Sequence, residues 1–128
     1  MIEKYSKFLV DSNIFIYHLN GEKVATKFLE ANIDKIYISR ITYIEVLSFN
    51  FENNEENNVI ELLNLFRVID TSDDIAMQCI KNRRVKKIKL ADNIIASTAM
   101  VYDYTLVTRN TKDFNGLELK IINPFLQE

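Results

Sequence analysis

The alternation of apolar runs and polar connections along the chain predicts short strands separated by helices. Short apolar runs bounded by polar residues predict buried strands at 8–10, 35–38, 67–69, 105–108 and 119–122. Between them, apolar residues recur at helical spacing and predict helices over 12–19, 22–31, 39–51, 55–65, 71–81 and 90–102. Strands joined by helices of this length form parallel crossovers, so the pattern predicts an α/β fold with a mainly parallel central sheet.

The composition limits the class of protein. The 128 residues fit one ordinary domain, so we predict that 1–128 form a single domain. The chain is 48% hydrophobic and 27% charged, with only 2 Gly and 1 Pro, which is typical of a globular protein. Cys79 is the single cysteine, which excludes an internal disulfide and a cysteine-based zinc cluster and favours a cytoplasmic location.

The net charge and the length of the apolar runs bear on binding to nucleic acid and to membranes. The formal net charge is −2, so nucleic acid would have to bind through local basic patches or bound cations. Residues 1–7 are too few and too polar for a signal peptide, and no apolar run is long enough to cross a membrane. We therefore expect a soluble protein.

Four acidic residues lie beside apolar sequence in four separate segments. Asp11 follows the first predicted strand, and Asp113 lies in the loop after the fourth. Glu45 borders the apolar face of its helix, on which the spacing places Ile44. Asp92 begins the face of the last helix that continues through two alanines, which we expect to leave space for a ligand. Functional groups in parallel sheets collect at the carboxyl ends of the strands, so we expect the four acids to share one site.

Each acid also has an ordinary structural explanation. Asp11 is a good N-cap, Glu45 can extend its carboxylate to water, and Asp92 lies where a helix dipole favours negative charge. Asp113 is typical of a polar turn. The occurrence of all four in separate apolar contexts is what favours a shared site.

The chemistry of such a site follows from its donor atoms. Oxygen ligands without His or Cys suit Mg²⁺ or Mn²⁺, and a divalent cation relieves the mutual repulsion of the carboxylates. A metal of this kind activates water and stabilises a phosphate undergoing hydrolysis. His18 is the only histidine and lies in an apolar helix, which argues against a zinc triad or a histidine base. Two glycines are too few for a P-loop or a dinucleotide fingerprint.

Four motifs, in order and spacing, resemble the PIN domain family; they occupy 9–13, 42–45, 90–96 and 108–114 and read LVDSN, TYIE, LADNIIA and TRNTKDF. The resemblance covers nearly the whole chain, whose length is similar to that of the VapC-type toxins of prokaryotic toxin–antitoxin pairs. It implies a three-layer α/β/α sandwich with endoribonuclease activity dependent on Mg²⁺ or Mn²⁺. It also implies an RNA substrate, frequent homodimers and a small antitoxin that covers or enters the active site.

The resemblance assigns roles to individual residues. Asp11, Glu45 and Asp92 match the three core acids of the metal site, and Asp113 matches a more variable fourth position. Asn93 stands where the family often has alanine. Four positions match residues that support the site by hydrogen bonding, namely Ser12, Asn13, Thr108 and Asn110.

Other functions remain open from the sequence. A receiver domain needs an acidic pair after its first strand, and a haloacid-dehalogenase-type phosphatase needs a second Asp where Asn13 stands. The stronger alternative is a PIN-like module that binds RNA or protein without cutting. Four mutually repelling carboxylates argue against it, because an inactive protein gains nothing from them.

A basic run and several apolar residues are candidates for contacts with partners. Residues 81–89 carry six basic residues, which ordinarily form a solvated surface. Their position just before Asp92 favours contact with RNA phosphates, although an acidic antitoxin tail is an alternative; the contact residues would be Arg83, Arg84, Lys86 and Lys87. The helix over 14–19 is apolar almost all round, and core burial explains it first, with a dimer or antitoxin groove as the alternative.

Overall fold

A five-stranded parallel sheet organises the protein, as seen in a computed structural model that describes residues 6–126. The strand order is β3-β2-β1-β4-β5, and every neighbouring pair is parallel. The strands are β1 (Phe8–Val10), β2 (Ile36–Ser39), β3 (Arg67–Ile69), β4 (Thr105–Val107) and β5 (Ile121–Ile122). All five predicted strands are confirmed, although β2 is shifted by one residue, β4 ends one residue earlier and β5 begins two residues later than predicted.

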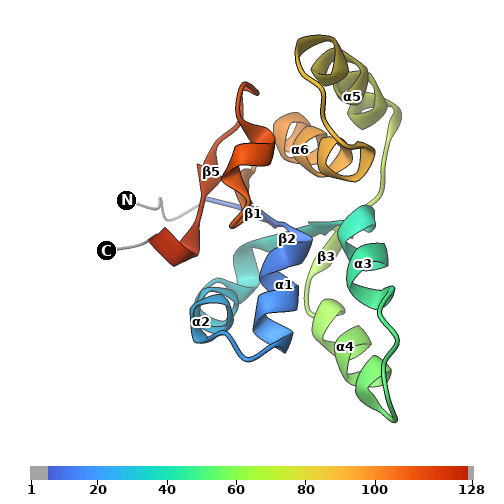
Figure 1. Cartoon of the computed structure of the whole chain (residues 1–128), viewed down its shortest axis with the longest axis vertical. Helices are drawn as coiled ribbons and strands as arrows, with labels where there is room; N and C mark the ends of the chain where they lie inside the picture. Colours follow the sequence, from blue (N-terminus) through green and yellow to red (C-terminus); the bar gives the residue numbers. More distant parts are fainter. Residues whose placement is uncertain (1–5, 127–128) are drawn as a thin grey trace.

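Within the described residues, six α-helices and two short 3-10 helices connect the strands, and a third 3-10 helix follows β5. Figure 1 shows how the helices are arranged around the sheet. The α-helices are α1 (Ser12–Leu19), α2 (Lys23–Ala31), α3 (Arg40–Leu47), α4 (Glu55–Leu63), α5 (Asp73–Val85) and α6 (Leu90–Tyr102). The 3-10 helices are η1 (Ile33–Lys35), η2 (Thr111–Phe114) and η3 (Pro124–Leu126). Within residues 6–126, no helix is long and apolar enough to cross a membrane. Our prediction of no signal peptide rests on residues 1–7. Of these, residues 1–5 lie outside the part of the chain that the structure describes.

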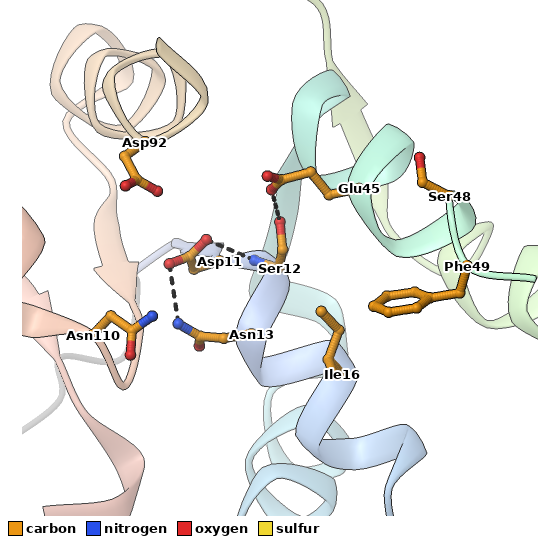
Figure 2. Close-up of a pocket in the computed structure, with 9 residues that line it drawn as sticks. All are labelled: Asp11, Ser12, Asn13, Ile16, Glu45, Ser48, Phe49, Asp92 and Asn110. Carbon is orange, nitrogen blue, oxygen red and sulfur yellow. Dashed lines mark hydrogen bonds between the residues drawn. The ribbon is translucent and has the colours of Figure 1, made fainter. Parts of the chain in front are cut away.

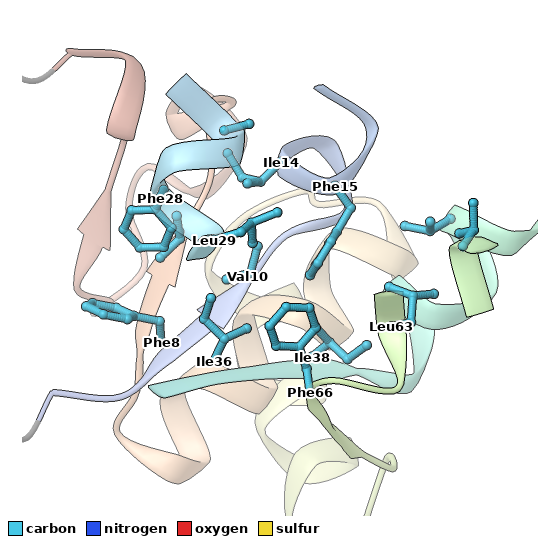
Figure 3. Packing of buried hydrophobic residues seen from close by; sticks show 14 residues of the cluster. Phe8, Val10, Ile14, Phe15, Phe28, Leu29, Ile36, Ile38, Leu63 and Phe66 are labelled. Carbon is cyan, nitrogen blue, oxygen red and sulfur yellow. The ribbon is translucent and has the colours of Figure 1, made fainter. Parts of the chain in front are cut away.

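Alternating side chains of the strands divide the core into two layers. Phe8 and Val10 of β1 pack with α1 and α2 on one face of the sheet (Figure 3). Leu9, which lies between them in sequence, packs with α6 on the other face. Because successive side chains of a strand point to opposite faces, both faces of this buried strand need a cover of helices. The predicted three-layer α/β/α sandwich is confirmed.

Local signals explain where the helices begin and where turns occur. The side chains of Asp11, Ser39 and Ser72 accept hydrogen bonds from backbone N–H groups at the starts of α1, α3 and α5. Gly21 and Gly116 mark turns, with φ of +87° and +92°. Glycine adopts these angles without the steric cost that a side chain would impose.

Helix α3 differs from the prediction in length and in its buried face. It ends at Leu47, not at residue 51, and the backbone of Asn53 beyond it has a left-handed φ of 55°. Ile44, predicted on the apolar face, is 52% exposed, whereas Val46 is fully buried. The apolar residues of this short segment fit more than one helical face, and packing against the sheet selects between them.

Helix α5 extends four residues further than predicted, from residue 81 to Val85. The first half of the basic run is therefore helical and is not a connection. Arg83 and Arg84 lie in the last turn of α5, where the helix dipole favours positive charge. The predicted bounds of α6, residues 90–102, are confirmed.

Candidate active site

Asp11 is positioned by the pairing of β1 with β4. Val10 is in register with Val107, so the residues that follow the two strands, Asp11 and Thr108, lie side by side. The Asp11 carboxylate accepts hydrogen bonds from the Thr108 hydroxyl at 2.8 Å and from the Ser12 backbone N–H at 2.7 Å. The Asn13 amide donates a third at 3.3 Å, drawn in Figure 2. Only 5% of Asp11 is exposed, so these donors hold a buried carboxylate in one orientation.

Glu45 and Asp92 approach Asp11 from two other helices. Glu45 lies on α3, and its carboxylate accepts a hydrogen bond of 2.5 Å from the Ser12 hydroxyl. Asp92 lies in the first turn of α6, on the other side of Asp11 (Figure 2). The side chains from the β1–α1 junction, α3 and α6 therefore face one space at the carboxyl end of the central strand, as expected for a parallel sheet.

That space is a cavity of about 410 Å³. Three of the four predicted acids line it, together with three of the four predicted supporting residues, one residue of α1 and two residues that follow α3. The lining residues are Asp11, Ser12, Asn13, Ile16, Glu45, Ser48, Phe49, Asp92 and Asn110. The lining contains no Lys, Arg, His or Cys, so the cavity is acidic and its ionisable donors are all carboxylates.

The fourth predicted acid, Asp113, does not line this cavity. It lies in η2, where it is exposed and borders a neighbouring cavity. Its charge nevertheless reaches the site, because it raises the pKa of Asp92.

Burial and mutual repulsion hold two carboxyl groups above their ordinary pKa. The pKa of Asp11 is raised from 3.8 to about 6. Burial is the largest cause, the charges of Asp92 and Glu45 act in the same direction, and the hydrogen bonds from Thr108 and Ser12 act against them. The pKa of Asp92 is also raised, first by burial and then by the charges of Asp113 and Glu45. A cluster of this kind becomes favourable when a cation neutralises it.

The donor set suits Mg²⁺ or Mn²⁺ in its chemistry, since carboxylate, amide and hydroxyl oxygens are the ligands that these ions prefer. Within residues 6–126, however, no three His, Cys, Asp or Glu side chains lie close enough together to form a ready ligand set for one ion. A cation in the cavity would have to draw Asp11, Glu45 and Asp92 closer to one another. The metal site therefore stays a prediction.

The four predicted supporting residues form one hydrogen-bonded group with Asp11 and Glu45. The Thr108 hydroxyl is its centre: it donates to Asp11 and accepts from the Asn13 amide at 3.1 Å and from the Asn110 backbone N–H at 3.0 Å. Ser12 links Asp11 to Glu45 through its backbone N–H and its hydroxyl. These hydrogen bonds connect the loop after β4 to the start of α1.

The basic run lies away from the acidic cavity, since Arg83, Arg84, Lys86 and Lys87 are all absent from its lining. Arg83 donates to the Ile88 backbone oxygen at the turn before α6. Lys86 donates to the Asp113 backbone oxygen at 2.9 Å, which joins α5 to η2. Contact of this run with RNA stays a prediction.

The two alanines of α6 do not leave space beside Asp92 as predicted. Ala96 and Ala99 are fully buried and pack with Leu9 and Leu106 of the sheet. Their small side chains allow the helix to approach the strands closely, so the core occupies the volume that we expected for a ligand.

The sequence prediction missed the apolar part of the cavity. Ile16 and Phe49 line it, and Phe49 is 52% exposed. The available signal was the helix over 14–19, which is apolar on more faces than one sheet can bury.

Comparisons with known proteins agree with this fold. The sequence model of the family described as "PIN domain" matches residues 8–118. No protein with a curated description matches the sequence. Among solved structures, a toxin–antitoxin complex from Klebsiella pneumoniae contains a chain that is 36% identical, with a TM-score of 0.81 and coverage of 92% of this chain and 98% of that one.

Two more distant structures share the fold. FitAcB from Neisseria gonorrhoeae is 24% identical, with a TM-score of 0.80 and coverage of 94% of this chain and 99% of that chain. The DNA-bound VapBC from Salmonella typhimurium is 20% identical, with a TM-score of 0.81 and coverage of 93% and 98%. At these identities, the likeness extends to the architecture of the chain.

Proposed function

Since the chain belongs to the PIN domain family, we propose that it is a VapC-like toxin that hydrolyses RNA with a divalent cation held by Asp11, Glu45 and Asp92. The observation that carries the proposal is the convergence of these three carboxylates, from three separate elements, on one acidic cavity of about 410 Å³. Burial, and after it mutual repulsion, raise the pKa of two of them, as expected for groups that bind a cation.

The 36% identical chain supports the toxin assignment, because it comes from a toxin–antitoxin complex and is matched over almost its whole length. We propose a small antitoxin as the partner of this chain for the same reason. A homodimer and a cytoplasmic location, both expected from the sequence, stay predictions.

The residues of the cavity divide the work of the proposed reaction. When bound, Mg²⁺ or Mn²⁺ supplies Lewis-acid stabilisation of the phosphate and lowers the pKa of a bound water. Asp11, held by hydrogen bonds from Ser12 and Thr108, would be the central ligand of the cation. Glu45 and Asp92 would complete the ligand set from the two flanking helices, and Asp113 would add negative charge from outside the cavity. Asn110 lies at the edge of the cavity, where its amide can donate to a phosphate oxygen.

The described residues contain no cluster of three acids close enough to hold a metal ion. This observation favours an alternative function, a non-catalytic module that binds RNA or protein. This alternative predicts RNA binding without cleavage under any metal condition.

The decisive experiment is an RNA-cleavage assay in Mg²⁺, Mn²⁺ or EDTA. Native protein is compared with Asp11→Asn and Asp92→Asn, and with Asp34→Asn as a matched control, because Asp34 is an exposed carboxylate on η1. We expect cleavage by the native protein and the control with either metal, and none in EDTA or in the two site variants. Cleavage that survives chelation or either site substitution contradicts the proposed mechanism.

A further inference from the structure

A second cavity, of about 560 Å³, adjoins the acidic one. It lies beside the loop that follows β4 and is lined mainly by residues 109–113 with Asn123 from the C-terminal side. Asn110 lines both cavities, so the two spaces meet at this residue. A chain molecule bound in the acidic cavity would extend into the second one without leaving the surface of the protein.

The second cavity has the opposite electrostatic character. The acidic cavity is lined by three carboxylates and no cation, whereas the second cavity is lined by Arg109 and Lys112 with one carboxylate, Asp113. The ion pairs within residues 6–126 are Arg40–Asp70 and Lys120–Asp103, and neither involves Arg109 or Lys112. Two cations without a paired carboxylate make this cavity suitable for an anion.

Arg109 is held in place before any ligand binds. Its guanidinium lies 4.1 Å from the centre of the Phe125 ring and 4.8 Å from the centre of the Tyr17 ring. These two rings also pack edge-to-face on each other, at 5.2 Å. The Arg109 backbone N–H donates to the Asn13 side chain, which lines the acidic cavity. A guanidinium fixed in this way loses less side-chain freedom on binding an anion than a freely rotating one.

We propose that the second cavity binds a phosphate of the RNA strand adjacent to the one that is cut, with Arg109 and Lys112 contacting the phosphate oxygens. The proposal rests on the proposed function and adds to it the place where the substrate strand is anchored. A guanidinium matches the geometry of a phosphate, and most contacts between proteins and nucleic acids are made to the backbone. The volume is in the range of sites for ligands the size of a nucleotide.

The reversal of charge between the cavities fits this arrangement. A phosphate in the acidic cavity must be accompanied by a cation, because three carboxylates repel it. A neighbouring phosphate on Arg109 and Lys112 needs no cation and would orient the strand. Lys86 donates to the backbone of Asp113, so the basic run over 81–89 reaches a residue that lines the second cavity.

The first test measures binding of a short single-stranded RNA in EDTA over a range of salt concentrations. We expect Lys112→Met to weaken binding by about tenfold at low salt and to reduce the slope of log affinity against log salt by about 0.7, the value for one phosphate contact on a single strand. Lys27→Met is the matched control, because Lys27 is an exposed lysine on α2 outside both cavities. We expect the control to bind like the native protein.

The second test locates the phosphate along the strand. Neutral methylphosphonate linkages replace the phosphates of the same RNA one at a time, and the affinity of each RNA is measured. We expect the native protein to lose about tenfold in affinity at one linkage next to the cleaved one, and Lys112→Met to show little loss there. Arg109→Met is expected to behave in the same way. Arg109 packs on two rings, so the thermal unfolding of the Arg109→Met variant is compared with that of the native protein. If this variant is unfolded, the Lys112→Met variant decides the test.

The outcomes separate this proposal from the proposed function. A flat methylphosphonate scan, or an unchanged salt slope in Lys112→Met, overturns the second site while metal-dependent cleavage still supports the nuclease. Loss of affinity for an acidic peptide with normal RNA binding shows a protein-docking site and also overturns it. Absence of cleavage with every metal overturns the nuclease, whatever the binding data show.

Discussion

Two acids that follow neighbouring strands of one sheet have very different surroundings. Asp11 comes directly after β1, is 5% exposed and accepts three hydrogen bonds. Asp113 comes after β4 but lies in an exposed 3-10 helix outside the acidic cavity. In the β4 loop, the position next to the strand belongs to Thr108, which supports Asp11. Only the residue at the strand end itself is held at the site by the sheet.

The two acids therefore contribute in different ways. In the proposed function Asp11 would contact the cation directly, and burial is the largest cause that raises its pKa to about 6. Asp113 acts at a distance, through the charge that raises the pKa of Asp92. This difference predicts unequal effects of the same chemical change at the two positions.

The largest effect is expected from removing one carboxylate charge at each position. Asp11→Asn should lower the rate of metal-dependent RNA cleavage by more than about 100-fold. Removing a residue that only hydrogen-bonds to a metal ligand costs about 10- to 100-fold, and removal of the ligand charge itself should cost more. Asp113→Asn should lower the rate by less than about tenfold. Single-turnover cleavage at saturating protein measures both, and equal losses would contradict the comparison.

The next effect concerns the Thr108 hydroxyl, which donates a hydrogen bond to Asp11. Thr108→Val keeps the shape of the side chain but removes the hydroxyl that donates to Asp11 and accepts from Asn13. We expect a loss of about 10- to 100-fold in metal affinity and cleavage, with most of it recovered in Thr108→Ser. Isothermal titration calorimetry with Mn²⁺ measures the metal affinity. Equal metal affinity in Thr108→Val and the native protein would show that this hydroxyl does not position Asp11.

A smaller effect concerns stability and pH. The pKa of Asp11 is raised in the folded state, so ionisation destabilises the fold; the associated stability is present below about pH 4 and is lost as the pH rises through about 6. In EDTA, Asp11→Asn should therefore be more stable than the native protein at pH 8, by about 1–2 kcal/mol, with no difference near pH 4. Urea unfolding at several pH values measures this.

Two observations serve as checks on that prediction. Mn²⁺ should stabilise the native protein and not Asp11→Asn, because a ligand stabilises only the state that binds it. A pH-independent gain in Asp11→Asn would mean that burial of the charge is not its cause.

The smallest effect is expected at Asp92. Because the charge of Asp113 raises the pKa of Asp92, Asp113→Asn should lower that pKa and shift the pH dependence of Mn²⁺ binding towards lower pH. The Asp34→Asn variant, which alters an exposed carboxylate on η1, should leave the profile unchanged. Mn²⁺ affinities measured across the acidic range decide this, and a profile identical to that of the native protein would remove Asp113 from the site altogether.

Much of the fold was predictable because its signals are local. The strand over 8–10, the capping acid Asp11 and the helix over 90–102 are all as predicted, since each is read from neighbouring residues. Helix α3 was predicted too long and on the wrong face. Its apolar residues allow several faces, and the choice is made by the sheet against which they pack.

The amino-acid sequence by itself determined the order of strands and helices, the parallel crossovers and the placement of Asp11 at a strand end. Only the tertiary structure decided which acids share a cavity. Thr108 reaches Asp11 because β4 pairs with β1, although the two residues are far apart in the chain, while Asp113 is left outside. The physical reason is that periodicity encodes which face of an element is buried, whereas distances between elements depend on strand order and register, which many distant contacts set together.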